Sequence, residues 1–179
     1  MLRRRRRIEG MPASVFDLTS PALSLADIAP ALADHPDLRG FLDAAISRAR
    51  NQSTMLAVLS LDIQPTRDAQ ACSEIDRRLR QCARRSDFIA QTDPHTWLIV
   101  AEYMDGPYAA HRLAHRVLDL LEQPFDLAGE RQSCSASIGI ATGSGVELDP
   151  ERLLWRASKA MRRAGREGGR KLIDAGISG

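Results

Sequence analysis

RRSDFIAQTDPHTW, residues 84–97, is the stretch from which the fold can be predicted. It begins where a helix, recognised by its apolar stripe, is predicted to end on an Arg-x-x-Asp sequence formed by Arg84 and Asp87. Two short apolar runs then flank the turn sequence DPHT at residues 93–96, and this pattern predicts a β-hairpin. A helix that leads directly into a hairpin therefore forms the centre of the predicted fold.

Helices and strands alternate on both sides of this hairpin. The run MLAVLSLDI, residues 55–63, is almost unbroken apolar sequence that ends near Asp62, which is typical of a strand buried on both faces. In a second strand, predicted at 133–142, Gly139 indicates a close approach by another element. The remaining predicted elements are helices at 36–50, 66–85, 108–122 and from 149 to the glycines at 165, 168 and 169, and an edge strand at 171–173. This alternation predicts an α/β domain in which helices pack on a sheet.

The composition indicates one domain of a cytoplasmic protein. The 179 residues are enough for a single domain with a core, and the net charge of +2 is too small to indicate nucleic-acid binding. The three cysteines, Cys72, Cys82 and Cys134, do not have metal-binding spacing and are typical of thiols in a reducing compartment. No apolar run approaches the ~20 residues of a membrane-spanning helix, and no signal peptide is recognised. We therefore expect a cytoplasmic protein without a membrane span.

The two ends of the chain are predicted to lie outside the domain. Residues 1–30 carry the arginine run Arg3–Arg7, several prolines and scattered apolar residues, which is typical of a flexible tail. The domain is predicted at residues 31–175, and residues 176–179 form a short C-terminal tail. A contact of the arginine run with anionic lipid or nucleic acid is the alternative to a solvated terminus. We favour the solvated terminus, so nucleic acid is not an expected partner.

Five short motifs follow one another along the predicted domain. They are Leu61-Asp62-Ile63, Arg84-x-x-Asp87, the hairpin that begins six residues later, Ser137-Ile138-Gly139-Ile140-Ala141, and Ala157-x-x-Ala160-Met161-x-x-Ala164. In this order and spacing they resemble the GGDEF domain of diguanylate cyclases, and the resemblance covers most of the predicted domain. It implies a single central sheet, mixed but mostly antiparallel, flanked by helices.

The resemblance also implies what this chain has lost. The family's enzymes join two GTP molecules into cyclic di-GMP, using clustered carboxylates to hold two divalent metal ions on the triphosphate. Their Gly-Gly-Asp/Glu-Glu-Phe signature would fall on residues 93–97, which read DPHTW, so His95 and Thr96 replace the acidic pair and Asp62 alone remains of the metal-binding set. The guanine-recognition segment is missing after Asp62, and Gly165 replaces the phosphate-binding lysine. We therefore expect a degenerate GGDEF domain with no cyclase activity, no metal and no cofactor.

The family has a second site, which binds the product through an Arg-x-x-Asp sequence and an arginine on the following helix. The resemblance assigns these roles to Arg84, Asp87 and Arg116, and Asp87 stands at the family's distance from the hairpin. An arginine fork can pair with guanine O6 and N7, while a carboxylate can accept from N1 and N2. Arg80 or Arg77 is then expected to meet the phosphates. The alternative for Arg84 and Asp87 is an ion pair at a helix end.

These expectations favour a receptor over an enzyme. We expect a catalytically inactive GGDEF-like domain that binds cyclic di-GMP and relays the signal to a protein partner in a signalling or motility system. A homodimer bridged by the ligand is the alternative to a monomer. The alternative function is a nucleotide-independent protein–protein interaction module on the same fold. Such a module would not use Arg84 and Asp87 to bind a ligand.

Overall fold

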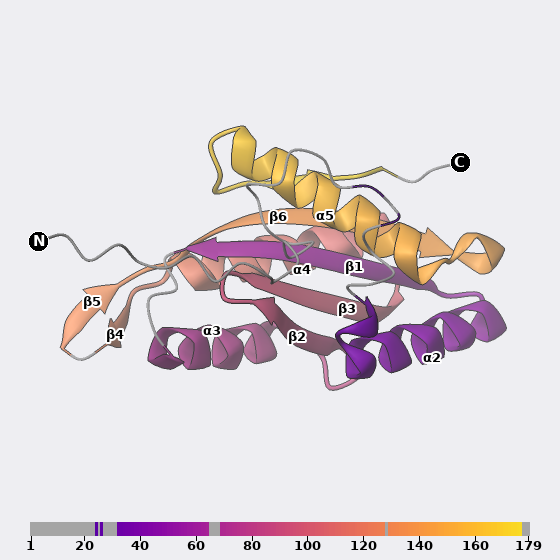
Figure 1. Ribbon diagram of the computed structural model, residues 1–179, viewed down its shortest axis with the longest axis horizontal. Coiled ribbons are helices and arrows are strands. Elements are labelled where there is room, and N and C mark those ends of the chain that lie inside the picture. The colour runs from indigo at the N-terminus through magenta and orange to yellow at the C-terminus, as the bar shows by residue number, and fades with distance from the viewer. Residues whose placement is uncertain (1–23, 25, 27–31, 65–68, 128, 177–179) are drawn as a thin grey trace, which may run out of the picture.

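The computed structural model describes residues 24, 26, 32–64, 69–127 and 129–176 (Figure 1). The predicted N-terminal tail, apart from Ser24 and Ala26, lies outside the described residues, and so do the Arg3–Arg7 run and residues 177–179 of the predicted C-terminal tail. None of the described helices is both long enough and apolar enough to cross a membrane.

Helices and strands alternate along the described chain in the predicted order. The helices are α2 (Pro36–Gln52), α3 (Ala69–Cys82), α4 (Pro107–Glu122), the short 3-10 helix η2 (Gly145–Glu147) and α5 (Pro150–Arg166). The strands are β1 (Met55–Gln64), β2 (Phe88–Asp93), β3 (Thr96–Met104), β4 (Phe125–Leu127), β5 (Glu130–Gln132), β6 (Ser135–Ser144) and β7 (Leu172–Asp174). Strands β4 and β5 were not predicted, because three residues are too few to show an alternating pattern.

The five-stranded sheet has the order β2-β3-β1-β6-β7. Neighbouring strands are antiparallel except β6 and β7, which are parallel. This mixed, mostly antiparallel sheet with flanking helices confirms the predicted fold class. Strand β1 lies in the centre and is buried from Leu56 to Ile63, as predicted for a strand covered on both faces. The small β4–β5 hairpin projects beyond one end of the sheet (Figure 1).

Alternate residues of β1 face two different helix layers. Leu56 and Val58 belong to a core cluster with residues of α2 and α5, whereas Leu59 belongs to a second cluster with residues of α3 and α4. Ser60 continues the first series, because its hydroxyl donates to the sulfur of Met161 in α5 at 3.1 Å. The sheet is therefore covered by helices on both faces.

Helix α5 crosses β6 at very short range. A Cβ atom at Gly139 would lie 2.0 Å from the carbonyl oxygen of Ala157 and 2.2 Å from the backbone nitrogen of Met161. Only a residue without a side chain fits at this crossing. The close approach predicted at Gly139 is thereby confirmed, and α5 is the element that approaches.

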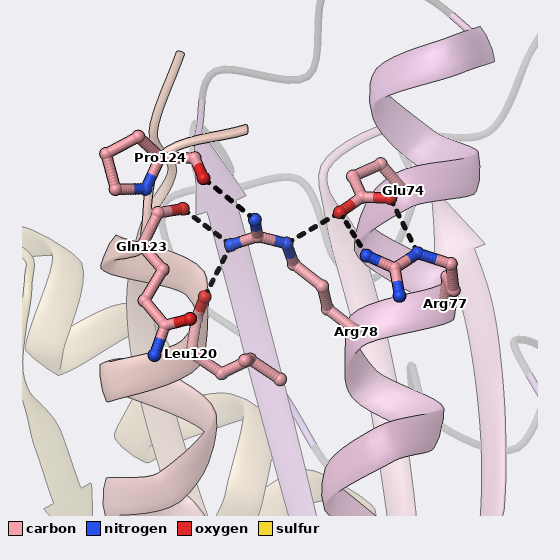
Figure 2. A network of polar contacts seen from close by, with 6 residues as sticks. All are labelled: Glu74, Arg77, Arg78, Leu120, Gln123 and Pro124. Atoms are coloured by element: carbon pink, nitrogen blue, oxygen red, sulfur yellow. Dashed lines mark hydrogen bonds and ion pairs between the residues drawn. The ribbon is translucent and has the colours of Figure 1, made fainter. Parts of the chain in front are cut away.

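A buried arginine, Arg78, ties α3 to the end of α4 (Figure 2). Its Nη1 donates to the carbonyls of Leu120 at 2.6 Å and Gln123 at 2.5 Å, and its Nη2 donates to the carbonyl of Pro124 at 3.1 Å. Its Nε donates to Glu74 at 2.8 Å. Because the last carbonyls of a helix have no partners within the helix, this guanidinium satisfies the C-terminal end of α4.

The same cluster gives the fold a sensitivity to acid. Hydrogen bonds from Arg77, and then from Arg78, lower the pKa of Glu74 from its ordinary value of 4.5 to about 2. Since the folded-state pKa is the lower one, the ionised carboxylate stabilises the fold fully above pH 4.5, and this stabilisation is lost as the pH falls toward 2. We expect Glu74→Gln to lower the free energy of unfolding by about 2 kcal/mol at neutral pH and to flatten its acid dependence, as measured by urea unfolding at a series of pH values.

The matched control for this prediction is Glu122→Gln. It removes the same charge at the exposed end of α4, where the carboxylate forms no ion pair with a described residue. Glu122→Gln should leave the pH dependence of the free energy of unfolding as it is in the wild type. If Glu74→Gln also leaves it unchanged, the proposed contribution of Glu74 is wrong.

Candidate functional site

The turn after α3 joins Arg84 and Asp87 through the backbone. The Asp87 N–H donates to the Arg84 carbonyl at 3.1 Å, and the Arg84 N–H donates to Asp87 Oδ2 at 2.7 Å. Asp87 Oδ1 accepts from the Glu102 N–H of β3 at 3.4 Å. The alternative expectation, an ion pair between the Arg84 and Asp87 side chains, is wrong, because the carboxylate binds the Arg84 amide and not its guanidinium. The Arg84 side chain is exposed and forms no ion pair within the described part of the chain.

Arg116 of α4 reaches the same end of α3. Its Nη2 donates to the carbonyl of Cys82, the last residue of that helix. In return, the Cys82 thiol lies 3.6 Å from the Arg116 carbonyl. A cation at a helix C-terminus is favourable, because the unsatisfied carbonyls there carry partial negative charge. Arg116 thus contacts the chain two residues before Arg84.

Arg80 lies one helical turn before this cluster. Its Nε and Nη2 donate to the two carboxylate oxygens of Asp76 at 2.7 and 3.2 Å, and these hydrogen bonds raise the pKa of Arg80. Arg77 is held in the same way by Glu74, at 2.8 and 2.7 Å. Neither arginine is linked directly to the Arg84 turn. Either one could meet a phosphate only by exchanging its carboxylate for the ligand.

The guanidinium groups of Arg84 and Arg116 and the carboxylate of Asp87 therefore lie near the C-terminal end of α3. The carboxylate is held in place by its hydrogen bonds to the backbone. Arg84 and Arg116 are exposed, and Asp87 is half-buried. Guanidinium groups donate in pairs to oxygen and nitrogen acceptors such as guanine O6 and N7. A carboxylate has lone pairs for several donors, so Asp87 can keep its backbone bonds and still accept from a ligand. The chemistry suits a purine that carries negative charge.

The hairpin turn lies at the other end of β2, beside Asp62. The His95 carbonyl accepts from the Ile63 N–H of β1 at 2.8 Å, and buried Thr96 is paired with Asp62 across the β1–β3 ladder. Burial raises the pKa of Asp62, which is only 7% exposed. The resemblance groups Asp62 with the hairpin turn, and the structure places the two side by side.

A pocket of about 540 Å³ opens next to Asp62. Its lining residues are Asp62, Gln64, Ser135, Ser137, Arg162, Gly165, Arg166, Gly168, Gly169 and Arg170. The three arginines were missed by the sequence reasoning. Arg162 and Arg166 lie four residues apart in α5, and this spacing is the signal that could have pointed to them, whereas Arg170 lies beyond the helix and has no such signal.

These lining residues do not fit a pair of divalent metal ions. Magnesium and its relatives need several carboxylate or carbonyl oxygens around each ion. Asp62 is the one carboxylate among the described residues that line the pocket, and arginines stand where further acids would be needed. No group of three His, Cys, Asp or Glu side chains that could hold a metal occurs within the described ranges.

Comparison with known protein families shows a match to one family model. The sequence profile of the family described as "Diguanylate cyclase, GGDEF domain" matches residues 70–171, which is more than half of the chain. The uncharacterized protein y4lL of Sinorhizobium fredii is 25% identical over an alignment of 131 residues, and this alignment covers 68% of the chain. The matched region spans only 16% of the length of that relative.

Comparisons with solved structures agree. The GGDEF domain of TpbB, also called YfiN, from Pseudomonas aeruginosa has a TM-score of 0.73 and 25% identity, over 79% of this chain and 89% of that chain. The GGDEF domain of DgcB from Caulobacter crescentus, solved in complex with c-di-GMP, has a TM-score of 0.64 over 75% of this chain and 85% of that chain. At 16% identity, the likeness to DgcB shows the fold alone.

Proposed function

The chain belongs to the GGDEF domain family of diguanylate cyclases, and on this premise we propose that it is a catalytically inactive member that binds cyclic di-GMP. The observation that supports the proposal is that Arg116 contacts the carbonyl of Cys82, two residues before Arg84, while the amide of Arg84 binds Asp87. A structural neighbour, the GGDEF domain of DgcB, was solved in complex with c-di-GMP, which supports this ligand.

The three side chains have distinct parts in the proposed site. The exposed guanidinium of Arg84 donates to O6 and N7 of one guanine. Asp87 accepts from the N1 and N2 donors of a guanine. Arg116 is held against α3 by the Cys82 carbonyl and supplies a second cation without a large change of conformation. Arg80 joins the phosphates by leaving Asp76.

The proposed loss of catalysis rests on the other end of the hairpin. Residues 93–97 read DPHTW, and the pocket beside Asp62 has arginines where metal-binding acids would be needed. The bound dinucleotide is then a signal and not a product of this chain. We place the receptor in the cytoplasm, where thiols such as those of the three free cysteines stay reduced, and we expect it to pass the signal to a protein partner in a signalling or motility system.

A second candidate function is a protein–protein interaction module that does not depend on a nucleotide. It is favoured by the state of Asp87, whose carboxylate already accepts from two backbone N–H groups. In that case the Arg-x-x-Asp sequence serves only to form the turn between α3 and β2.

Isothermal titration calorimetry with cyclic di-GMP separates the two candidates. We expect the wild type to bind, and Arg84→Ala and Arg116→Ala each to weaken binding by about tenfold or more, because each removes charge-assisted hydrogen bonds to the ligand. Asp87→Asn keeps an oxygen acceptor for the turn and is expected to weaken binding as well. Arg85→Ala, at an exposed neighbour of Arg84, is the matched control and should bind as the wild type does.

The outcomes are distinct. A wild type that gives no heat and no shift in melting temperature at ligand concentrations far above micromolar would contradict the receptor and leave the interaction module. The proposed inactivity is checked on the same preparation with GTP and Mg²⁺, from which chromatography should detect no cyclic di-GMP.

A further inference from the structure

A second groove, of about 330 Å³, runs between α5 and the edge strand β7. It is lined by Arg152, Trp155, Arg156, Lys159, Ala160, Arg163, Arg166, Ile173, Asp174 and Ala175. Its five cations recur every three or four residues along α5, so they share one side of this helix, the orange-yellow one in Figure 1. This groove does not include Arg84, Asp87 or Arg116.

The positive charge in the groove is mostly uncompensated. Arg163 is paired with Glu167 at 2.7 Å, and the groove's one carboxylate, Asp174, is 2.5 Å from His111. The other four cations, Arg152, Arg156, Lys159 and Arg166, form no ion pair with any described residue. A groove with this balance attracts a partner that carries negative charge.

Two of these cations have a defined contact with the rest of the chain. The Lys159 ammonium lies 4.7 Å from the centre of the Trp155 ring. Arg156 Nη1 donates to the Thr142 carbonyl at 3.2 Å, while its Nη2 is buried without an acceptor among the described residues. Lys159 therefore lies beside an aromatic ring at the groove, whereas Arg156 is fixed by its hydrogen bond to the Thr142 carbonyl.

The strand beside the groove has an open edge. The Lys171 carbonyl and the Ala175 N–H each bond to β6, at 2.9 Å. Successive residues of a strand direct their backbone groups alternately to the two sides, so those of Leu172 and Asp174 face away from β6. Within the described ranges, β7 is the last strand of the sheet on this side. An open edge is a template for one more strand.

We propose that this groove binds an extended acidic segment of a partner protein, which adds to the open edge of β7 as a strand. Alternate side chains of such a strand point to one face. Carboxylates would meet the cations of α5, and a small apolar side chain between them would contact Trp155, Ala160 and Ile173. The proposal deepens the proposed relay to a protein partner by naming the chemistry of that partner, but it does not depend on cyclic di-GMP.

The open strand edge favours a polypeptide over a nucleic acid. An acidic polypeptide and a nucleic acid both carry negative charge that the arginines of the groove would attract. Only the polypeptide has backbone N–H and C=O groups at the spacing that pairs with a strand. The experiment therefore tests the backbone of the partner as well as its charge.

The probe is a short fluorescein-labelled peptide in which every second residue is serine and the residues between them read Glu, Val, Glu, Val, Glu, so that carboxylates and valines share one face of the strand. Its binding to the full chain is measured by fluorescence anisotropy without cyclic di-GMP. We expect the double variant Arg152→Glu, Arg166→Glu to weaken binding by about tenfold or more. The double variant Arg112→Glu, Arg131→Glu makes the same change of charge at exposed sites of α4 and β5 and should bind as the wild type does. Arg84→Ala should also bind normally, so failure here is distinguishable from failure of the nucleotide site.

Two further probes test strand addition. Peptides with N-methyl groups on alternate backbone amides, in one register or the other, should differ by about tenfold, because only one of them blocks the N–H groups that face β7. A single-stranded oligonucleotide of equal charge should bind more weakly than the peptide. The proposal is overturned if the wild type does not bind the peptide below about 1 mM, if the two methylated peptides bind equally, or if the oligonucleotide binds more tightly.

Discussion

Gly139→Ala is expected to lower the free energy of unfolding by about 3 kcal/mol or more. The added methyl group would meet the Ala157 carbonyl oxygen and the Met161 nitrogen at 2.0 and 2.2 Å, and both are backbone atoms of α5. No side-chain rotation can relieve such a contact, so the helix itself would have to move away from the sheet. That movement would also separate the hydroxyl of Ser60 from Met161.

Gly40→Ala is the matched control. Gly40 lies in α2, and a Cβ atom there would meet nothing within 4 Å. Alanine is a better helix former than glycine, so this variant should raise the free energy of unfolding by about 0.5–1 kcal/mol. Urea unfolding followed by circular dichroism measures both variants. Equal stability of Gly139→Ala and the wild type would show that α5 does not cross β6 as closely as described.

Arg78→Met is expected to lower the free energy of unfolding by about 3 kcal/mol. The substitution keeps much of the apolar stem but removes the donors to three carbonyls at the end of α4. It also leaves Glu74 with Arg77 as its remaining cation. Buried carbonyls without partners are destabilising, and the loss of the guanidinium stacked 4.8 Å from the Phe125 ring adds to the effect.

Arg77→Met tests whether burial is the reason. Arg77 binds the same carboxylate of Glu74, but its side chain is 56% exposed, against 8% for Arg78. Ion pairs in solvent contribute little, so Arg77→Met should lower the free energy of unfolding much less than Arg78→Met does. Both variants are measured by urea unfolding at neutral pH. If they lose the same stability, the contacts of Arg78 with α4 do not have the importance assigned to them.

Most of the fold could be predicted because its core is periodic. The unbroken apolar run of β1, the stripe of α4 and the N-cap of α5, where Asp149 accepts from the Arg152 N–H at 2.7 Å, all have local signals. The parallel pairing of β7 with β6 has none, because it is decided by how α5 returns the chain to the sheet. Arg78 was missed for a similar reason: an arginine on a helix is normally solvated, and only the position of α4 makes it buried.

The candidate site could be predicted in part. The resemblance assigned the roles of positions 84, 87 and 116. The contact of Arg116 with the end of α3 depends on the tertiary structure, so no local sequence pattern predicts it. The ion pair considered for Arg84 and Asp87 was wrong because a carboxylate three residues on reaches the backbone amide more easily than a flexible guanidinium. The groove on α5 was missed because its cations become a site only beside the edge of β7.

The two faces of β1 also limit how this strand can pair. Ser60 and Asp62 point to the α5 side, while Leu59 and Leu61 enter the apolar cluster of α3 and α4. A slip of β1 by one residue against its neighbours would exchange the two sets and bury the carboxylate of Asp62 among apolar side chains. Asp62 therefore favours the correct register of the central strand.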